Sequence, residues 1–189
     1  MKRSLITLAL TAAQLAPALA QVDVAKSSVP QGFPSVIVAI SKQMGVPVDG
    51  KFKRFTAQVS FDPAKPAEGK ASVEIDIASF DLGDTDFNRE TAKKEWFDAA
   101  KFPKATFVTS AIKPAGAGKF EATGKLTIKG ITRDVVAPVS FKAEGGQQVF
   151  EGVLPIKRLQ FNIGEGEWKD TSTVADDVQI RFRIVTAKK

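Results

Sequence analysis

The sequence has no cysteine, no histidine and no tyrosine among its 189 residues. Without cysteine it can form no disulfide, zinc ribbon or iron–sulfur cluster, and it has no thiol nucleophile. Without histidine it has no serine–histidine–aspartate triad, no imidazole base and no histidine ligand for haem or copper. Oxygen ligands remain, and these suit calcium or magnesium. Most of the chemistry that enzymes use is therefore excluded before any motif is considered.

The residues that are present describe an ordinary globular chain with an unusual choice of aromatic side chains. Hydrophobic residues make up 43% and charged residues 25%, so the composition does not indicate disorder. Phenylalanine occurs 14 times against two tryptophans, which makes the aromatic surface almost wholly apolar. No basic run interleaved with aromatic residues stands out, so we expect no nucleic-acid partner. The length is consistent with one domain.

Residues 1–20, MKRSLITLALTAAQLAPALA, have the layout of an export signal. Two basic residues follow the first methionine, a short apolar stretch comes next, and Ala18 and Ala20 are the small residues that signal peptidase recognises. The apolar stretch is too short to span a bilayer comfortably. We therefore expect cleavage after Ala20, a mature chain of residues 21–189 and a periplasmic location.

The dominant pattern in the remaining chain is a period-two alternation of apolar and polar side chains. Such alternation is typical of half-buried strands with one face in water. It is clear in residues 54–62, 71–80, 104–113, 119–130 and 176–186. It is weaker in residues 22–28, 35–42, 135–143 and 147–155.

Short segments rich in glycine, proline and charged residues separate these strands. They lie at residues 62–70, 113–119, 129–134 and 144–147. Strands that follow one another with short turns indicate an antiparallel sandwich or barrel rather than βαβ units. We therefore expect an all-β domain, a single antiparallel barrel of about eight strands.

One segment, residues 84–103, interrupts the alternation and is rich in helix formers. It predicts a short helical insertion near 85–102, capped by Thr85 or Asp86 and stopped by Pro103. The insertion carries four large aromatic side chains, Phe87, Trp96, Phe97 and Phe102.

The same segment contains the sharpest match to a metal-site template. Asp84, Asp86, Asn88 and Glu95 hold positions 1, 3, 5 and 12 of a calcium-binding loop. Position 6 is Arg89, where that loop needs glycine for its sharp turn. We therefore expect helix capping and a solvated acidic turn here, and no metal site.

The apolar faces of the strands carry phenylalanine at many positions. An antiparallel barrel of about eight strands is just wide enough either to be filled by side chains or to hold one small ligand. The pattern by itself leaves a filled core and a ligand cavity equally open.

Several longer stretches carry a family resemblance. The most specific are FDAAKFPKATF at 97–107 and TGKLTIKGITRDV at 123–135, with further matches at 61–66, 161–164 and 178–184. In these stretches the sequence resembles the YceI-like periplasmic proteins, a polyisoprenoid-binding family with a lipocalin-like barrel. The resemblance implies an apolar tunnel for an isoprenoid chain, such as a quinone or polyprenyl phosphate tail, and a helical insertion that covers the mouth. It also implies a membrane cytochrome of the b561 type as a partner.

The alternation and the resemblance together predict a lipid-binding site with no cofactor other than the lipid. The expected wall consists of Phe55, Val59, Phe61, Val73, Ile75, Phe107, Phe120, Leu126, Phe141, Phe150 and Phe182. The expected lid consists of Phe87, Trp96 and Phe97, with Trp168 nearby. Arg89 or Arg158 is expected to meet a polar or phosphate headgroup, since arginine suits anions. We expect a monomer or a homodimer.

Two alternatives stay open at this point. One is a stress-response structural module whose barrel is filled. The other is a lipid-modifying enzyme that uses carboxylates, for which Glu165 with Glu167 and Asp176 with Asp177 are the close pairs in sequence. Binding is favoured because burial rewards an isoprenoid by about 0.8 kcal/mol per CH₂ group without any nucleophile or metal.

Overall fold

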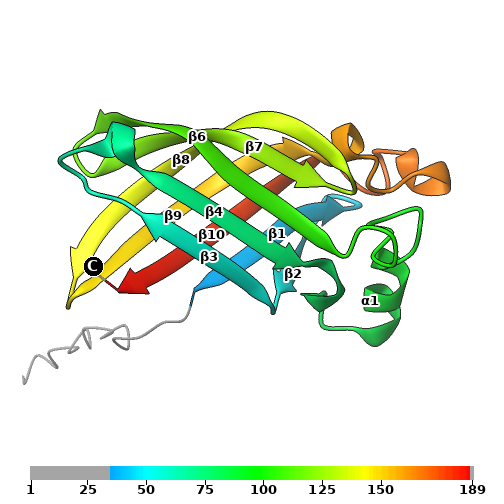
Figure 1. Ribbon diagram of the computed structural model, residues 1–189. Coiled ribbons are helices and arrows are strands. Elements are labelled where there is room, and N and C mark those ends of the chain that lie inside the picture. Colours follow the sequence, from blue (N-terminus) through cyan, green and yellow to red (C-terminus); the bar gives the residue numbers. More distant parts are fainter. Residues whose placement is uncertain (1–34, 188–189) are drawn as a thin grey trace, which may run out of the picture. The chain divides into compact units, whose positions relative to one another are not determined.

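The computed structural model describes residues 35–187, which form one strongly curled antiparallel sheet with a short helix at one end (Figure 1). The sheet has ten strands in the order β3-β4-β6-β7-β8-β9-β10-β1-β2-β5. Their bounds are β1 Val36–Gln43, β2 Val46–Phe52, β3 Phe55–Ser60, β4 Lys70–Asp76, β5 Phe80–Asp81, β6 Lys104–Gly116, β7 Lys119–Ile128, β8 Ile131–Glu144, β9 Gln147–Lys157 and β10 Asp177–Ala187.

The period-two pattern correctly identifies the buried face of the strands. In β7, for example, burial alternates so that Phe120, Ala122, Leu126 and Ile128 face the core while Glu121 and Lys125 face solvent. The expected turns at 62–70, 113–119, 129–134 and 144–147 all fall between strands or at their ends. The expected strand at 22–28 lies outside the described residues.

The sheet has ten strands rather than about eight because two short strands lack the alternating pattern. One is β2, which contains Pro47 and Gly50, and the other is the two-residue β5. Both lie at the end of the strand order, where proline and glycine are tolerated because few ladder hydrogen bonds depend on them. In β2 the inward positions are Val48, Gly50 and Phe52, so the glycine and the neighbouring proline interrupt the apolar–polar alternation in the sequence.

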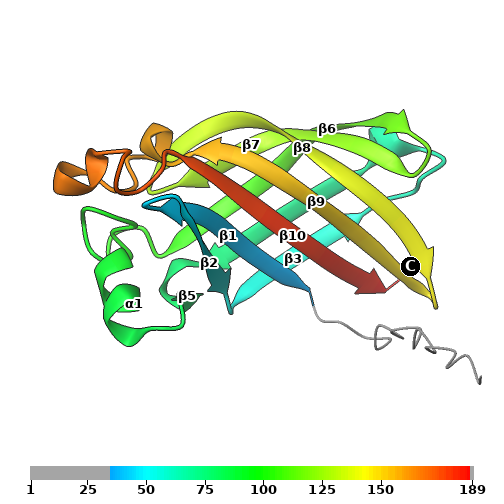
Figure 2. The same cartoon turned by 180° about the vertical axis from the view of Figure 1, so that it is seen from behind.

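Within residues 35–187 the first and last strands of the order, β3 and β5, do not pair with each other, so the sheet is a strongly curled half-barrel. A β-bulge between Thr109 and Ala111, opposite Gly124, contributes to the bend. Where β3 comes round towards β9, the Gln148 side-chain amide donates to the Phe61 carbonyl at 3.1 Å. The lipocalin-like architecture expected from the sequence is confirmed, and the same curl is visible from behind (Figure 2).

The helical insertion is shorter than expected. Helix α1 covers Thr85–Thr91, and residues 92–103 are mostly turns. Its N-cap is Asp84 rather than Thr85 or Asp86, and the Asp84 carboxylate accepts from the Asp86 and Phe87 N–H groups at 2.8 and 3.0 Å. The first residue of the calcium-loop template is thus a helix cap. Within the described part of the chain, no cluster of three acidic side chains is placed to hold a metal ion.

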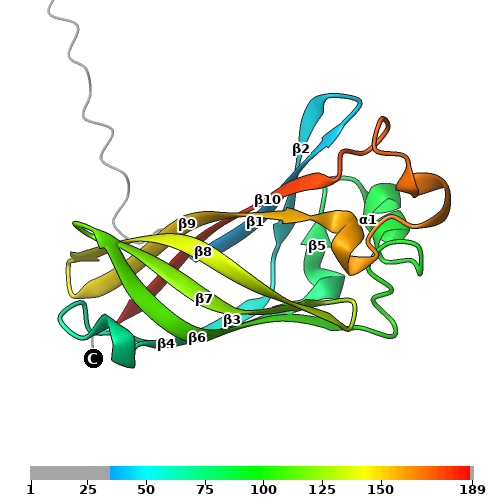
Figure 3. The ribbon, with the colours of Figure 1, turned by 90° about the horizontal axis from the view of Figure 1, so that it is seen from above.

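The two ends of the half-barrel differ in what covers them (Figure 3). One, here called the cap end, carries α1, residues 92–103, the β1–β2 turn and residues 158–176, which include short 3-10 helices at Arg158–Phe161 and Gly166–Lys169. The other, the hairpin end, carries the turns that follow β3, β6 and β8. Two further 3-10 helices lie at Pro66–Glu68 and Ile77–Ser79. Among residues 35–187, no helix has the length and apolar character needed to cross a membrane.

Candidate functional site

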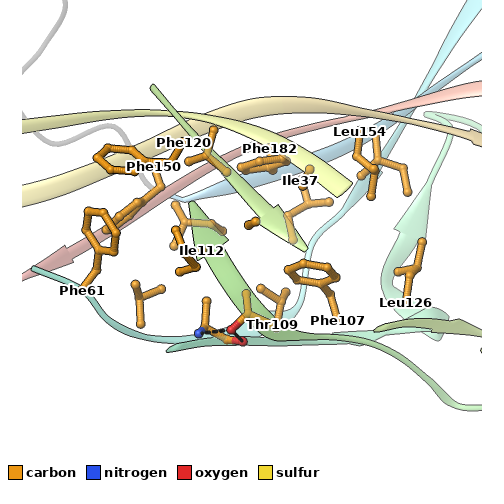
Figure 4. A pocket seen from close by; sticks show the side chains of 18 of the residues that line it. Ile37, Phe61, Phe107, Thr109, Ile112, Phe120, Leu126, Phe150, Leu154 and Phe182 are labelled. Atoms are coloured by element: carbon orange, nitrogen blue, oxygen red, sulfur yellow. Dashed lines mark hydrogen bonds between the residues drawn. The ribbon is translucent and has the colours of Figure 1, made fainter. Parts of the chain in front are cut away.

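The curled sheet encloses an apolar cavity of about 130 Å³, here called the inner chamber. Its lining includes these members of the predicted wall: Val59, Phe61, Val73, Ile75, Phe107, Phe120, Leu126, Phe150 and Phe182 (Figure 4). Every lining side chain is apolar except Thr109. The Thr109 hydroxyl accepts from the Ala71 N–H at 2.8 Å and donates to the Ala71 carbonyl at 3.2 Å. The described residues therefore offer a ligand no free polar group in the inner chamber.

Two predicted wall residues lie elsewhere. Phe55 packs against the core but borders an open groove beside β3 instead of the inner chamber. Phe141 packs on the rings of Phe61 and Phe150, with centroid distances of 5.2 and 5.3 Å. Together with Phe120, whose ring lies 4.9 Å from that of Phe61, these three form a phenylalanine plug at the hairpin end.

Small residues keep the inner chamber open. Ala122 on β7 and Ala137 on β8 are direct partners across the ladder, and both line the chamber. On the other side, Gly152 is the partner of Phe182, and a Cβ added there would lie 2.5 Å from the phenylalanine ring. The Phe182 ring therefore lies flat against the wall. Sequence analysis missed these small residues, because alternation shows which face a side chain occupies but not how much space is left.

A second cavity of about 280 Å³, here called the cap chamber, lies at the cap end. It brings together the whole predicted lid and one predicted headgroup residue: Phe87, Trp96, Phe97, Trp168 and Arg158. The rings of Trp96 and Trp168 are in contact in a tilted arrangement, with their centroids 5.5 Å apart and their planes at 50°. Phe87 is 58% exposed, so it forms the rim of the chamber rather than its interior.

The two chambers adjoin along the strands. Ile180 of β10 lines both of them. On β7, Leu126 lines the inner chamber and Ile128 the cap chamber, and on β9 the pair is Leu154 and Ile156. Successive inward positions of one strand thus face successive chambers, which places the two cavities in line.

Arg158 lines the cap chamber, but its hydrogen bonds are made within the protein. Arg158 is 2% exposed, and its five N–H groups are all engaged by main-chain carbonyls. The acceptors are Ala175, Ile163, Gly164, Trp168 and Val174, at 3.1, 2.8, 3.0, 2.7 and 2.7 Å. Burial lowers the pKa of the guanidinium, against the opposing effect of Asp176, but arginine stays protonated in proteins. In this structure Arg158 therefore organises the cap loop, and a headgroup contact through it stays a prediction.

Arg89, the other headgroup candidate, does not reach either chamber. Its side chain is 71% exposed on α1, and its guanidinium lies 3.3 Å from the Asp86 carboxylate. Arginine identity alone could not distinguish a solvated helix residue from a ligand contact.

A buried lysine holds the cap in place. The Lys129 side chain is 7% exposed and its ammonium donates to the Lys94 carbonyl at 2.7 Å, to the Asn162 carbonyl at 2.6 Å and to the Glu165 carboxylate at 2.8 Å. These bonds tie residues 92–103 to residues 158–176. Sequence analysis missed this residue, which looks like an ordinary turn lysine.

The carboxylate pairs considered for catalysis do not face the cavities. Glu165 pairs with Lys129, Asp176 accepts from the Leu159 N–H at 3.0 Å, and Asp177 pairs with Lys157 at 2.7 Å. Among the described residues that line the two chambers, the one carboxylate is that of Glu90, and it is ion-paired with Lys93. The arrangement suits the burial of an apolar chain better than acid–base chemistry.

Comparison with known proteins agrees with this architecture. The family model described as YceI-like domain matches residues 21–186. A UPF0312 protein of Pseudomonas syringae pv. syringae is 34% identical over 147 residues, which cover 75% of each chain. The crystal structure of Burkholderia cenocepacia BcnA is 59% identical, with a TM-score of 0.80 over 81% of this chain and 96% of that one.

Two further solved structures share the fold. A Campylobacter jejuni YCEI protein is 30% identical, with a TM-score of 0.66 over 75% of this chain and 85% of that one. A polyisoprenoid binding domain from Saccharophagus degradans is 15% identical, with a TM-score of 0.64 over 81% of this chain and 93% of that one. From the family match and these relatives, the chain belongs to the YceI-like family.

Proposed function

We propose that the protein binds an isoprenoid lipid in the inner and cap chambers and carries it without transforming it. The observation that carries this proposal is the inner chamber, apolar except for the internally hydrogen-bonded Thr109, in line with a larger chamber at the cap end. Such enclosed apolar cavities are typical of small-ligand sites. The Saccharophagus degradans domain of the same fold, described as polyisoprenoid-binding, supports the choice of ligand class.

The sizes of the chambers indicate how a chain is held. An engineered apolar cavity of roughly 150 Å³ binds benzene, so the inner chamber, at about 130 Å³, suits about one five-carbon isoprene unit as it stands. Burial of five carbons at about 0.8 kcal/mol each gives roughly 4 kcal/mol per unit. A longer chain occupies the cap chamber as well, and further units require the phenylalanine plug to move. Its four rings are held by packing alone, which makes such a shift feasible.

The headgroup lies at the cap end, because that chamber contains the polar atoms. Trp96 lines that chamber, and its indole N–H is buried without a hydrogen-bond partner within the described residues, where an unpaired donor costs about 1–3 kcal/mol. The proposed ligand is either a quinone or a polyprenyl phosphate, and chemical identification of the headgroup distinguishes the two.

The cellular role follows from the export signal predicted at residues 1–20. A carrier in the periplasm moves an apolar molecule through water between membrane sites. A membrane cytochrome of the b561 type remains the partner suggested by the family resemblance, and it is consistent with a quinone ligand.

Native mass spectrometry of the protein purified from its own periplasm, with lipid extraction of the same sample, tests this function. A stoichiometric isoprenoid adduct is expected, and its mass identifies the tail and the headgroup. Protein that carries no lipid and takes up neither added quinone nor added polyprenyl phosphate would instead support the filled structural module. Accumulation of a chemically altered lipid during incubation would support the enzyme.

A further inference from the structure

The turn between β1 and β2 exposes apolar side chains at an unusual backbone position. Met44 and Gly45 form a two-residue turn in which both φ angles are positive, at 49° and 82°. Such a type I′ turn favours asparagine followed by glycine, and methionine is a poor residue for the left-handed region. Met44 is 79% exposed, and Val46 directly after the turn is 63% exposed. Neither the left-handed backbone nor the exposure to water favours methionine at position 44, which points to a function for its side chain.

The turn is anchored at the rim of the cap chamber. The Met44 N–H donates to the Thr173 carbonyl at 2.8 Å, and Gln43 forms a β-bridge with Val174. Gln43 and Val174 both line the cap chamber. Figure 3 shows the β1–β2 hairpin projecting away from the sheet at the cap end. The exposed apolar tip is therefore fixed beside the opening through which a ligand would pass.

We propose that the cap end docks on the surface of a lipid bilayer through this tip, defined here as residues 42–47. The inference rests on the proposed function, because an isoprenoid has to leave a bilayer and enter the chamber beside the tip. Lys42 is exposed and is the single charged residue in the tip. An apolar tip with one cation matches a bilayer that contains anionic headgroups.

A second feature of the cap end fits the same surface. Phe87 on α1 is 58% exposed while also lining the cap chamber. An apolar rim on the cap chamber shortens the path over which an entering isoprenoid contacts water. The tip and Phe87 thus present apolar side chains from two different elements at the opening of the cap chamber.

The experiment measures the fraction of the exported protein that floats with vesicles made of phosphatidylethanolamine and phosphatidylglycerol, and compares this fraction between wild type and variants. The test variant is Met44→Asn, which supplies the residue that a type I′ turn favours. We expect its melting temperature to stay equal or rise, while its partitioning onto the vesicles falls about tenfold, as the loss of one buried methionine side chain implies. The control is Val136→Asn, which removes a 51% exposed apolar side chain from the outer face of β8 and should float like wild type.

Uptake of a short-chain quinone from detergent solution, without vesicles, is measured in parallel and separates the two proposals. Met44→Asn should take up the quinone as wild type does and receive it more slowly from vesicles. Equal flotation of Met44→Asn and wild type overturns the docking site, as does wild type that floats only with vesicles containing a membrane protein. Failure of all variants to take up quinone or polyprenyl phosphate from detergent overturns the proposed function, whatever the flotation shows.

Discussion

The inner chamber can be filled from its wall by a single substitution, Ala137→Leu. Ala137 is 3% exposed, lines the chamber and lies directly opposite Ala122. Leucine adds three carbons to a space of about 130 Å³. Burial of these carbons stabilises the protein by up to roughly 2.4 kcal/mol, against an overpacking cost of about 1–3 kcal/mol. We expect the free energy of unfolding of the ligand-free protein to change by less than about 2 kcal/mol.

Ligand binding should respond much more strongly than stability. The three added carbons displace about three carbons of the bound chain, which costs about 2.4 kcal/mol and weakens binding roughly fifty-fold. Urea unfolding gives the stability, and titration with a short-chain isoprenoid quinone gives the affinity. A variant of the neighbouring residue, Val136→Leu, is the control, because that side chain is 51% exposed on the opposite face of β8.

Three outcomes bear on the reasoning. Wild-type affinity in Ala137→Leu would show that the chain does not occupy the inner chamber. A loss of stability well above 3 kcal/mol would show that the space is not available to a side chain. Equal weakening by Val136→Leu would show that the effect is not specific to the chamber.

Three further substitutions test the cap and its support. Lys129→Met should lower the free energy of unfolding by about 2–3 kcal/mol, because it removes the three hydrogen bonds of a buried ammonium, whereas Lys125→Met, which breaks an exposed ion pair, should cost less than about 1 kcal/mol in the same urea titration. Arg158→Lys replaces five donors by three, so it should cost about 2–4 kcal/mol and shift the tryptophan emission to longer wavelength; an unchanged spectrum and stability would contradict its role. The Lys53 ammonium, with the Asn88 and Gly83 N–H groups, holds the pKa of Asp81 well below its usual range. Asp81→Asn should therefore lower the melting temperature at pH 7, and the difference should shrink as the pH falls below about 4, where the unfolded chain takes up the proton; a difference that is constant with pH would refute this.

The strands and their buried faces could be predicted from the sequence. Alternation in β3, β4, β7 and β10 follows from the geometry of the extended chain, because successive side chains point to opposite faces of a sheet. The pattern failed for β2, where Pro47 and Gly50 replace it, and for the length of α1, which ends at Thr91 because tertiary contacts hold the following residues in turns.

The site could be predicted only in part. All five phenylalanines that line the inner chamber were identified, because inward position depends on local periodicity, but only four of its aliphatic lining residues were. The roles of the arginines were not, because a guanidinium can bind an anion, an acidic neighbour or main-chain carbonyls, and the sequence does not say which. In the folded chain, five carbonyls from residues 163–175 converge on Arg158.

By itself the sequence determined the class of fold, the face each main strand buries and the absence of thiol and imidazole chemistry. These properties depend on composition and on neighbours close in the chain. The tertiary structure decided that the barrel has room for a ligand. That room depends on which side chains meet across strands, such as Ala122 with Ala137 and Gly152 with Phe182. Packing between residues distant in the chain sets the volume that is left, and no local pattern records it.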